Sequence, residues 1–196
     1  PPGIETARAI IEASGKPGND FFRNAPERQI SFFHRIGDRP RLIEVHDQLV
    51  RESFSDLFHQ SGLDDWFPTL DVRRRLPLLF ASLGENELAG SLFRAYDQAL
   101  ATYQWNHLSF LNDYIAFLID SGDFPAAEKL LKEVLPKSLR IDLRLVPRLY
   151  QALGQLDRWE ELTKDCQLTR GQSAMIRDWA SALAEGREMV DAVKQW

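Results

Sequence analysis

Apolar residues recur three and four positions apart along most of this chain, and short turn signals interrupt the pattern. The clearest stretch covers residues 126–135, where Lys129, Lys132 and Glu133 occupy the face between the apolar positions. That spacing places the apolar side chains on one side of an α-helix. Strand-like alternation of Val, Ile and Thr is almost absent. The sequence therefore predicts an all-α protein of about ten helices, each of roughly 10 to 20 residues, joined by short turns.

Glycine and proline mark the turns between these predicted helices. At the best-defined turn, Gly122 suits the left-handed conformation that ends a helix, Asp123 suits the cap of the next helix, and Pro125 suits its first turn. Pro77 and Pro147 lie within apolar helical patterns, so each predicts either a kink or a helix start. Further turn signals lie at Gly84, Gly154 to Asp157, Gly171 and Gly186.

The turns recur along the chain with similar flanking residues. Positions 111–131 match positions 146–166 at an offset of 35 residues (146 − 111), with Gly122 opposite Asp157. An earlier window at 76–93 precedes the first of these by 38 residues (122 − 84), and a weaker echo at 30–42 precedes that window by 47 (84 − 37). A single helical hairpin cannot bury its apolar faces, so repeated hairpins must stack on their neighbours.

Ten positions in these windows are expected to pack the repeats, two of them turn glycines and the others apolar. They are Gly84, Ala89, Phe93, Tyr114, Gly122, Ala127, Leu131, Leu149, Trp159 and Leu162. We expect a single repeat domain over residues 1–196, with irregular capping or cut ends at 1–25 and 182–196. The best repeats lie at about 70–104, 108–141 and 143–170. The chain begins Pro-Pro-Gly without an initiator Met, so we expect an excised or processed piece.

The segment YIAFLIDSGDFPAAEKLL at 114–131 resembles the tetratricopeptide repeat family, whose helix–turn–helix unit recurs at about 34 residues. Gly122 stands at its turn, Ala127 where the second helix approaches the first, and Pro136 near the end; the next window has Leu162 where the family prefers Ala. The resemblance implies an α-solenoid, a right-handed superhelix of about five stacked helix–turn–helix hairpins. It also implies a protein-binding scaffold, of the sort found in chaperone, secretion, envelope-assembly and polysaccharide-export systems. A general helical-hairpin solenoid is the alternative.

The charge balance disfavours nucleic acid as a partner. The chain has 24 Lys and Arg against 29 Asp and Glu, a net charge of −5, and a pI near 5.4. Domains that bind phosphate backbones usually carry a positive balance. An RNA-binding helical repeat therefore stays an alternative, with an affinity that would fall steeply with salt. No apolar run approaches the roughly 20 residues of a membrane span, so we expect a soluble segment, cytoplasmic or, in a bacterial envelope protein, periplasmic.

The sequence offers little that could support catalysis. His34, His46 and Asp47 superficially match the His and Asp ligands of metal-dependent phosphohydrolases, but their spacing identifies no further ligand. This enzyme is the least favoured hypothesis, and we expect no catalytic residue, metal or cofactor. The single cysteine, Cys166, takes an inward apolar position, and the neighbouring Asp165 disfavours its thiolate.

A polar concave face is the candidate binding surface. If the first helices of the hairpins line it, four side chains would face inward: Arg74, Asn112, Arg144 and Gln151. We therefore expect a non-catalytic scaffold, a fragment of a larger assembly or export protein, that binds another protein or peptide, an acidic one where these arginines meet it. Aromatic residues at helix ends are either packing anchors or contact hot spots: Trp66, Phe67, Tyr103, Trp105 and Trp196.

Overall fold

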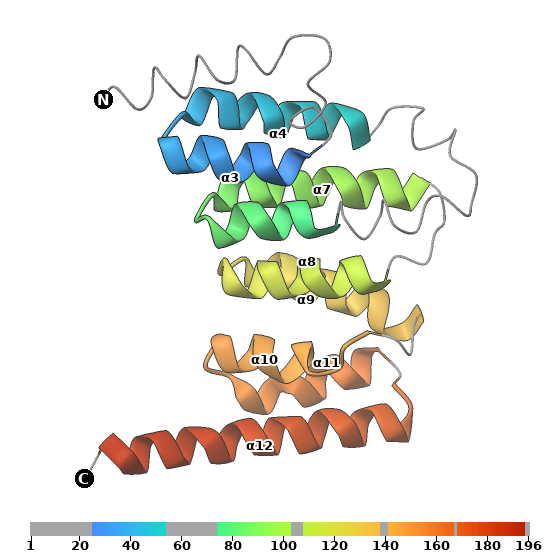
Figure 1. Cartoon of the computed structure of the whole chain (residues 1–196). Coiled ribbons are helices and arrows are strands. Elements are labelled where there is room, and N and C mark those ends of the chain that lie inside the picture. Colours follow the sequence, from blue (N-terminus) through green and yellow to red (C-terminus); the bar gives the residue numbers. More distant parts are fainter. Residues whose placement is uncertain (1–24, 54–73, 103–107, 138–140, 167, 195–196) are drawn as a thin grey trace. The chain divides into compact units, whose positions relative to one another are not determined.

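Helices joined by short turns make up the described part of the chain. The computed structural model describes residues 25–53, 74–102, 108–137, 141–166 and 168–194 (Figure 1). Every regular element in these ranges is a helix, so the prediction of an all-α protein is confirmed. None of these helices is both long and apolar enough to cross a membrane. Contacts group the chain into two compact units, Pro1–Trp105 and Asn106–Trp196.

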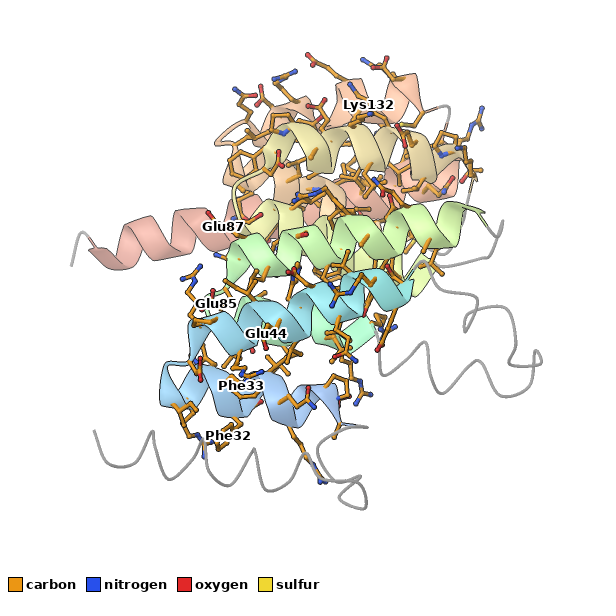
Figure 2. All side chains as sticks on the ribbon, turned by 90° about the horizontal axis from the view of Figure 1, so that it is seen from above. Phe32, Phe33, Glu44, Glu85, Glu87 and Lys132 are labelled. Carbon is orange, nitrogen blue, oxygen red and sulfur yellow. The ribbon has the colours of Figure 1, made fainter. Side chains whose placement is uncertain are left out.

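The first unit contains helices α3 (Pro26–Ile36), α4 (Arg39–Ser53) and α7 (Asn86–Thr102), with a further helix at 74–82. α4 packs against both α3 and α7. The core between them consists of large apolar side chains that are at most 6% exposed: Ile30, Phe33, Leu42, Leu49, Phe80, Leu92 and Phe93. Arg39 at the start of α4 adds an ion pair to Glu85, with 3.5 Å between Nη2 and the carboxylate (Figure 2 labels Glu85).

The second unit is built on α10, which contacts the helices on either side of it. Its elements are α8 (Leu108–Asp120), α9 (Phe124–Val134), η1 (Leu135–Lys137), α10 (Leu145–Ala152), η2 (Leu156–Arg158), α11 (Trp159–Asp165) and α12 (Arg170–Lys194). α10 packs against α8, α9, α11 and α12. Pro147 lies in the first turn of α10, so it marks a helix start and removes no helical hydrogen bond.

The same glycine turn ends the first helix of four hairpins. Gly37, Gly84, Gly122 and Gly154 have φ of 71°, 81°, 83° and 68°. In each turn the N–H after the glycine donates to a carbonyl five residues back, at 2.8 to 3.0 Å; the acceptors are Phe33, Phe80, Leu118 and Tyr150. This is the Schellman arrangement, which satisfies the last carbonyls of a helix. All four acceptor residues are buried. Each turn therefore sets the direction of the next helix at a residue that is itself part of the core.

The helix that follows Gly122 begins with a side-chain cap. Asp123 caps α9 by accepting a hydrogen bond from the Ala126 N–H at 3.3 Å, as predicted, and Pro125 lies in the first turn. The eight apolar positions assigned to repeat packing are all at most 8% exposed, from Ala89 to Leu162. A right-handed superhelix and one continuous domain over 1–196 stay predictions.

One pairing in the repeat alignment and one predicted turn are wrong. The glycine that corresponds to Gly122 is Gly154, not the position of Asp157, because the 3₁₀ turn η2 separates Gly154 from α11. The break predicted at Gly186 does not occur, and α12 is helical through residue 194. Gly186 lies among helix-forming residues and has no positive φ, so it lowers helix propensity without ending the helix.

We predict that Gly122→Ala destabilises the second unit by about 1–2 kcal/mol, because alanine at φ 83° places its Cβ too close to the following carbonyl oxygen. No neighbouring atom lies within 4 Å of the added Cβ, so backbone strain accounts for the loss. Gly186→Ala is the matched control: it also meets no atom within 4 Å, and it should stabilise α12 by up to about 1 kcal/mol. Urea unfolding followed by circular dichroism measures the free energy of unfolding of both variants. Equal changes in the two variants would contradict the left-handed turn at Gly122.

Candidate functional site

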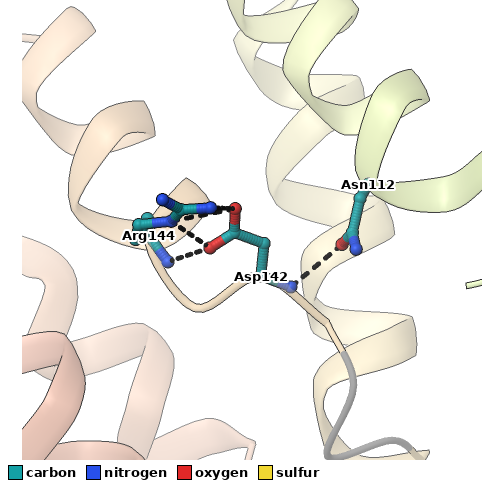
Figure 3. A network of polar contacts seen from close by, with 3 residues as sticks. All are labelled: Asn112, Asp142 and Arg144. Carbon is teal, nitrogen blue, oxygen red and sulfur yellow. Dashed lines mark hydrogen bonds and ion pairs between the residues drawn. The ribbon is translucent and has the colours of Figure 1, made fainter. Parts of the chain in front are cut away.

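Two of the four predicted face residues lie in one polar network, which centres on Asp142 (Figure 3). The Asp142 N–H donates to Oδ1 of Asn112 on α8 at 3.0 Å. Arg144 Nε donates to Asp142 Oδ1 at 2.8 Å, and Arg144 Nη2 donates to Oδ2 at 2.7 Å. Asp142 Oδ1 also accepts from the Arg144 backbone N–H at 3.0 Å, so the same carboxylate orders the turn that leads into α10. The network thus joins α8 to the first turn of α10.

The charges in this network largely cancel. The side-chain hydrogen bonds from Arg144 lower the pKa of Asp142 and outweigh the effect of partial burial, which acts in the opposite direction. The same hydrogen bonds raise the pKa of Arg144. A fork-to-fork pair of this kind fixes the guanidinium plane and satisfies much of its hydrogen-bonding capacity. Arg144 therefore offers an acidic partner less charge than the sequence suggests.

An exposed apolar patch lies beside Arg144. The Trp179 ring on α12 is 5.7 Å from the Arg144 guanidinium carbon, measured to the ring centroid, in a cation–π contact. Trp179 is 44% exposed, and Met175, one turn earlier on α12, is 54% exposed. Both flank the buried stripe of α12 that includes Ile176 and Ala180. We call the surface of Arg144, Met175 and Trp179 the Trp179 face.

The other two predicted face residues lie on two different helices. Gln151 is half-buried on α10, and Arg74 is half-buried on the helix at 74–82, in the first unit. Arg148 on α10 pairs instead with Asp120 at the end of α8. The aromatic candidates Trp66, Phe67, Tyr103, Trp105 and Trp196 lie outside the described residues.

Sequence reasoning assigned no role to Asp142, Met175 or Trp179. A signal for Trp179 was present, since it lies one helical position off the apolar stripe of an otherwise polar helix. No sequence pattern places Arg144 beside it, because the two residues are 35 positions apart (179 − 144) and meet only when α12 packs on α10.

A second network ties α9 to α10. The buried Tyr150 hydroxyl donates to Glu128 Oε1 at 3.2 Å, and Lys132 Nζ lies 3.0 Å from the same oxygen (Figure 2 labels Lys132). Burial raises the pKa of Tyr150, and the Glu128 charge raises it further. Burial is the largest single influence on Glu128 and raises its pKa. The hydrogen bonds from Lys132 and Tyr150 and the charges of Lys132 and Arg158 together outweigh it, so the pKa of Glu128 is lowered. This network is structural, because it lies within the α9–α10 packing.

The residues considered for catalysis lie in the cores of the units or on α3 and α4. His46 is 5% exposed on α4; its Nδ1 is 3.0 Å from Asp47 Oδ1, and its ring meets the edge of Phe80 at 5.8 Å. His34 is on α3. Within the described part of the chain, no three His, Cys, Asp or Glu side chains gather as a metal site would require. Cys166 is 3% exposed; burial raises the pKa of its thiol, and Asp165 adds to the shift.

We predict that Asp142→Ala costs about 1 kcal/mol of stability through the lost hydrogen bond to the Arg144 backbone N–H, plus a further loss from the unpaired Arg144 side chain. Asp123→Ala is the control, because Asp123 caps a helix but pairs with no arginine.

The stabilisation that Asp142 provides also depends on pH. Because the pKa of Asp142 is lowered in the folded protein, this stabilisation is present above the ordinary aspartate pKa near 4 and disappears as pH falls below it. Urea unfolding at pH 3 and pH 7 should show a smaller acid loss in Asp142→Asn than in the parent. An unchanged acid loss would contradict the assignment.

We predict that Tyr150→Phe lowers stability by about 0.5–1.5 kcal/mol at pH 7, through loss of the hydrogen bond to Glu128. The unfolded tyrosine loses its proton near pH 10, while the raised pKa of folded Tyr150 keeps the proton in place. Unfolding of the parent therefore becomes easier as pH rises above 10, and the Phe variant lacks this contribution. Unfolding curves from pH 8 to 11 measure the difference, and parallel pH profiles would contradict it.

Comparison of the chain with family models, with curated proteins and with solved structures finds no match. The resemblance to tetratricopeptide repeats therefore stays a prediction that rests on the residues around Gly122. The geometry of the described residues is the basis for the functional proposals that follow.

Proposed function

We propose that this chain is a non-catalytic helical-hairpin scaffold that binds another protein through the Trp179 face. The observation that carries the proposal is the exposure of Trp179 and Met175 on one flank of α12, with Arg144 held against the ring. Tryptophan, methionine and arginine are enriched at protein interfaces, and tryptophan and arginine dominate binding hot spots. An exposed Trp–Met pair one helical turn apart is thus better explained by a partner than by folding.

The network beneath the face supports this proposal. Asp142 holds the Arg144 guanidinium through three side-chain hydrogen bonds, and Arg144 in turn covers one side of the Trp179 ring. Side chains that are already ordered lose less conformational entropy when a partner binds. The face is therefore prepared for binding before the partner arrives.

The partner that suits this face differs from the acidic peptide expected from the arginines alone. Because Asp142 balances the charge of Arg144, a carboxylate would gain little there. The open part of the face is apolar, so the partner would supply an apolar or aromatic side chain to Trp179 and Met175.

The repeated glycine turns support a scaffold architecture of stacked hairpins. The four turns share the left-handed glycine and the same hydrogen bond to a buried residue. Stacked hairpins of this kind provide extended binding surfaces without a catalytic centre. A right-handed solenoid like that of the tetratricopeptide repeats is part of this proposal.

We predict that Trp179→Ala weakens partner binding at least tenfold, since removal of a hot-spot tryptophan commonly costs more than 1.4 kcal/mol. The partner would be captured by cross-linking to the full chain in extract of the source cells, then purified, and its Kd measured by calorimetry. Ile43→Ala is the matched control, because Ile43 is an exposed apolar residue of the first unit, 38% exposed. An unchanged Kd for Trp179→Ala would refute the proposal. Binding only to RNA, with steep salt dependence, would favour the RNA-binding alternative.

A further inference from the structure

The exposed side of α12 that carries Met175 and Trp179 has two borders. Ala182 is also exposed, three positions after Trp179, so the three side chains follow one another along this side of the helix. The buried Ile176 lies on the side toward α10. One border of the exposed strip therefore faces α10, where Arg144 meets the Trp179 ring, and the other border lies away from α10.

The border away from α10 is acidic. Asp178 is three positions after Met175, and Glu185 is three positions after Ala182, so both carboxylates lie beside the exposed strip. Both side chains are exposed, and no ion pair joins either of them to another residue of the described ranges. Arg177 is next to Asp178 in sequence, but consecutive residues of a helix point in different directions and do not face each other. This border therefore presents two uncompensated negative charges.

α12 itself supplies no cation that could reach these carboxylates. Residues that face each other on a helix are three or four positions apart. At those distances Asp178 has Ala174, Met175, Ser181 and Ala182, and Glu185 has Ser181, Ala182, Glu188 and Met189. None of these residues is basic, so the negative charge beside the strip is available to a partner. The opposite border differs, because Asp142 already compensates Arg144 there.

We propose that the partner places a lysine or arginine next to the apolar or aromatic side chain that it packs on Trp179 and Met175. The inference rests on the proposed function and deepens it, because it names the charge of the partner segment. The ammonium or guanidinium group would pair with Asp178 and Glu185, while the aliphatic stem of the same side chain would lie on the apolar strip. An acidic segment would meet like charge at this border, which disfavours it as a partner.

Selection from a random peptide display library against the full chain tests this inference. The enriched peptides should share an apolar or aromatic residue with a lysine or arginine close beside it. The double variant Asp178→Lys with Glu185→Lys should weaken their binding about tenfold in fluorescence anisotropy, because it replaces two attractions with two repulsions. Peptides in which glutamate replaces the basic residue should bind the double variant more tightly than they bind the parent. A structural effect of the substitutions would not produce this exchange of preference.

The matched control is the double variant Glu133→Lys with Glu160→Lys. It makes the same change in net charge at two exposed carboxylates of α9 and α11, outside the strip on α12. Binding of the enriched peptides to this control should be close to that of the parent. Circular dichroism should show that both double variants keep the helical content of the parent.

Four outcomes would overturn the inference: no enriched peptide, enriched peptides without a basic residue, equal binding to the parent and to Asp178→Lys with Glu185→Lys, or a concentration-dependent dimer that this double variant abolishes. The last would make a second copy of the chain the occupant. The proposed function has a separate readout in the captured partner. If Trp179→Ala weakens binding of that partner and the double variant does not, only the basic residue is refuted. If Trp179→Ala leaves that binding unchanged, the proposed function itself fails.

Discussion

The hydrogen bond that closes each glycine turn is the interaction on which the hairpins depend. The N–H after the glycine reaches a carbonyl five residues back, which requires the glycine to be left-handed. In each of the four turns, the accepting carbonyl belongs to a residue whose large side chain lies in the core: Phe33, Phe80, Leu118 or Tyr150. Backbone geometry and apolar burial therefore meet at one residue of each turn. A Cβ at the glycine would strain the backbone, although it would meet no neighbouring atom.

Polar contacts then fix how neighbouring helices are positioned against each other, which apolar burial alone does not determine. In the second unit, Asp142 connects Asn112 on α8 to Arg144 on α10, and Glu128 on α9 connects to Tyr150 on α10. These contacts join successive hairpins at defined side-chain positions, whereas apolar packing tolerates small shifts. The pair of Asp142 and Arg144 also has a functional consequence, since it places a charge-compensated guanidinium over the exposed ring of Trp179.

One flank of α12 gives the proposed scaffold its candidate surface. Met175 and Trp179 present apolar area with little free charge, which favours an apolar or aromatic contact. The buried stripe of Ile176 and Ala180 holds α12 on α10, so the Trp179 face depends on this packing.

The sequence by itself determined the helical class, the turn at Gly122 with its Asp123 cap, and the buried positions from Ala89 to Leu162, because helix periodicity and turn chemistry are local properties of the chain. It placed a turn at Gly154 to Asp157 but paired Asp157, not Gly154, with Gly122, since nothing local distinguishes the 3₁₀ segment η2 from the start of α11. It also predicted a break at Gly186, which does not occur because glycine weakens a helix without ending one. Only the tertiary structure decided the candidate surface. Arg144 meets Trp179 because α12 packs on α10; contacts between residues that distant in sequence are fixed by packing and leave no local pattern.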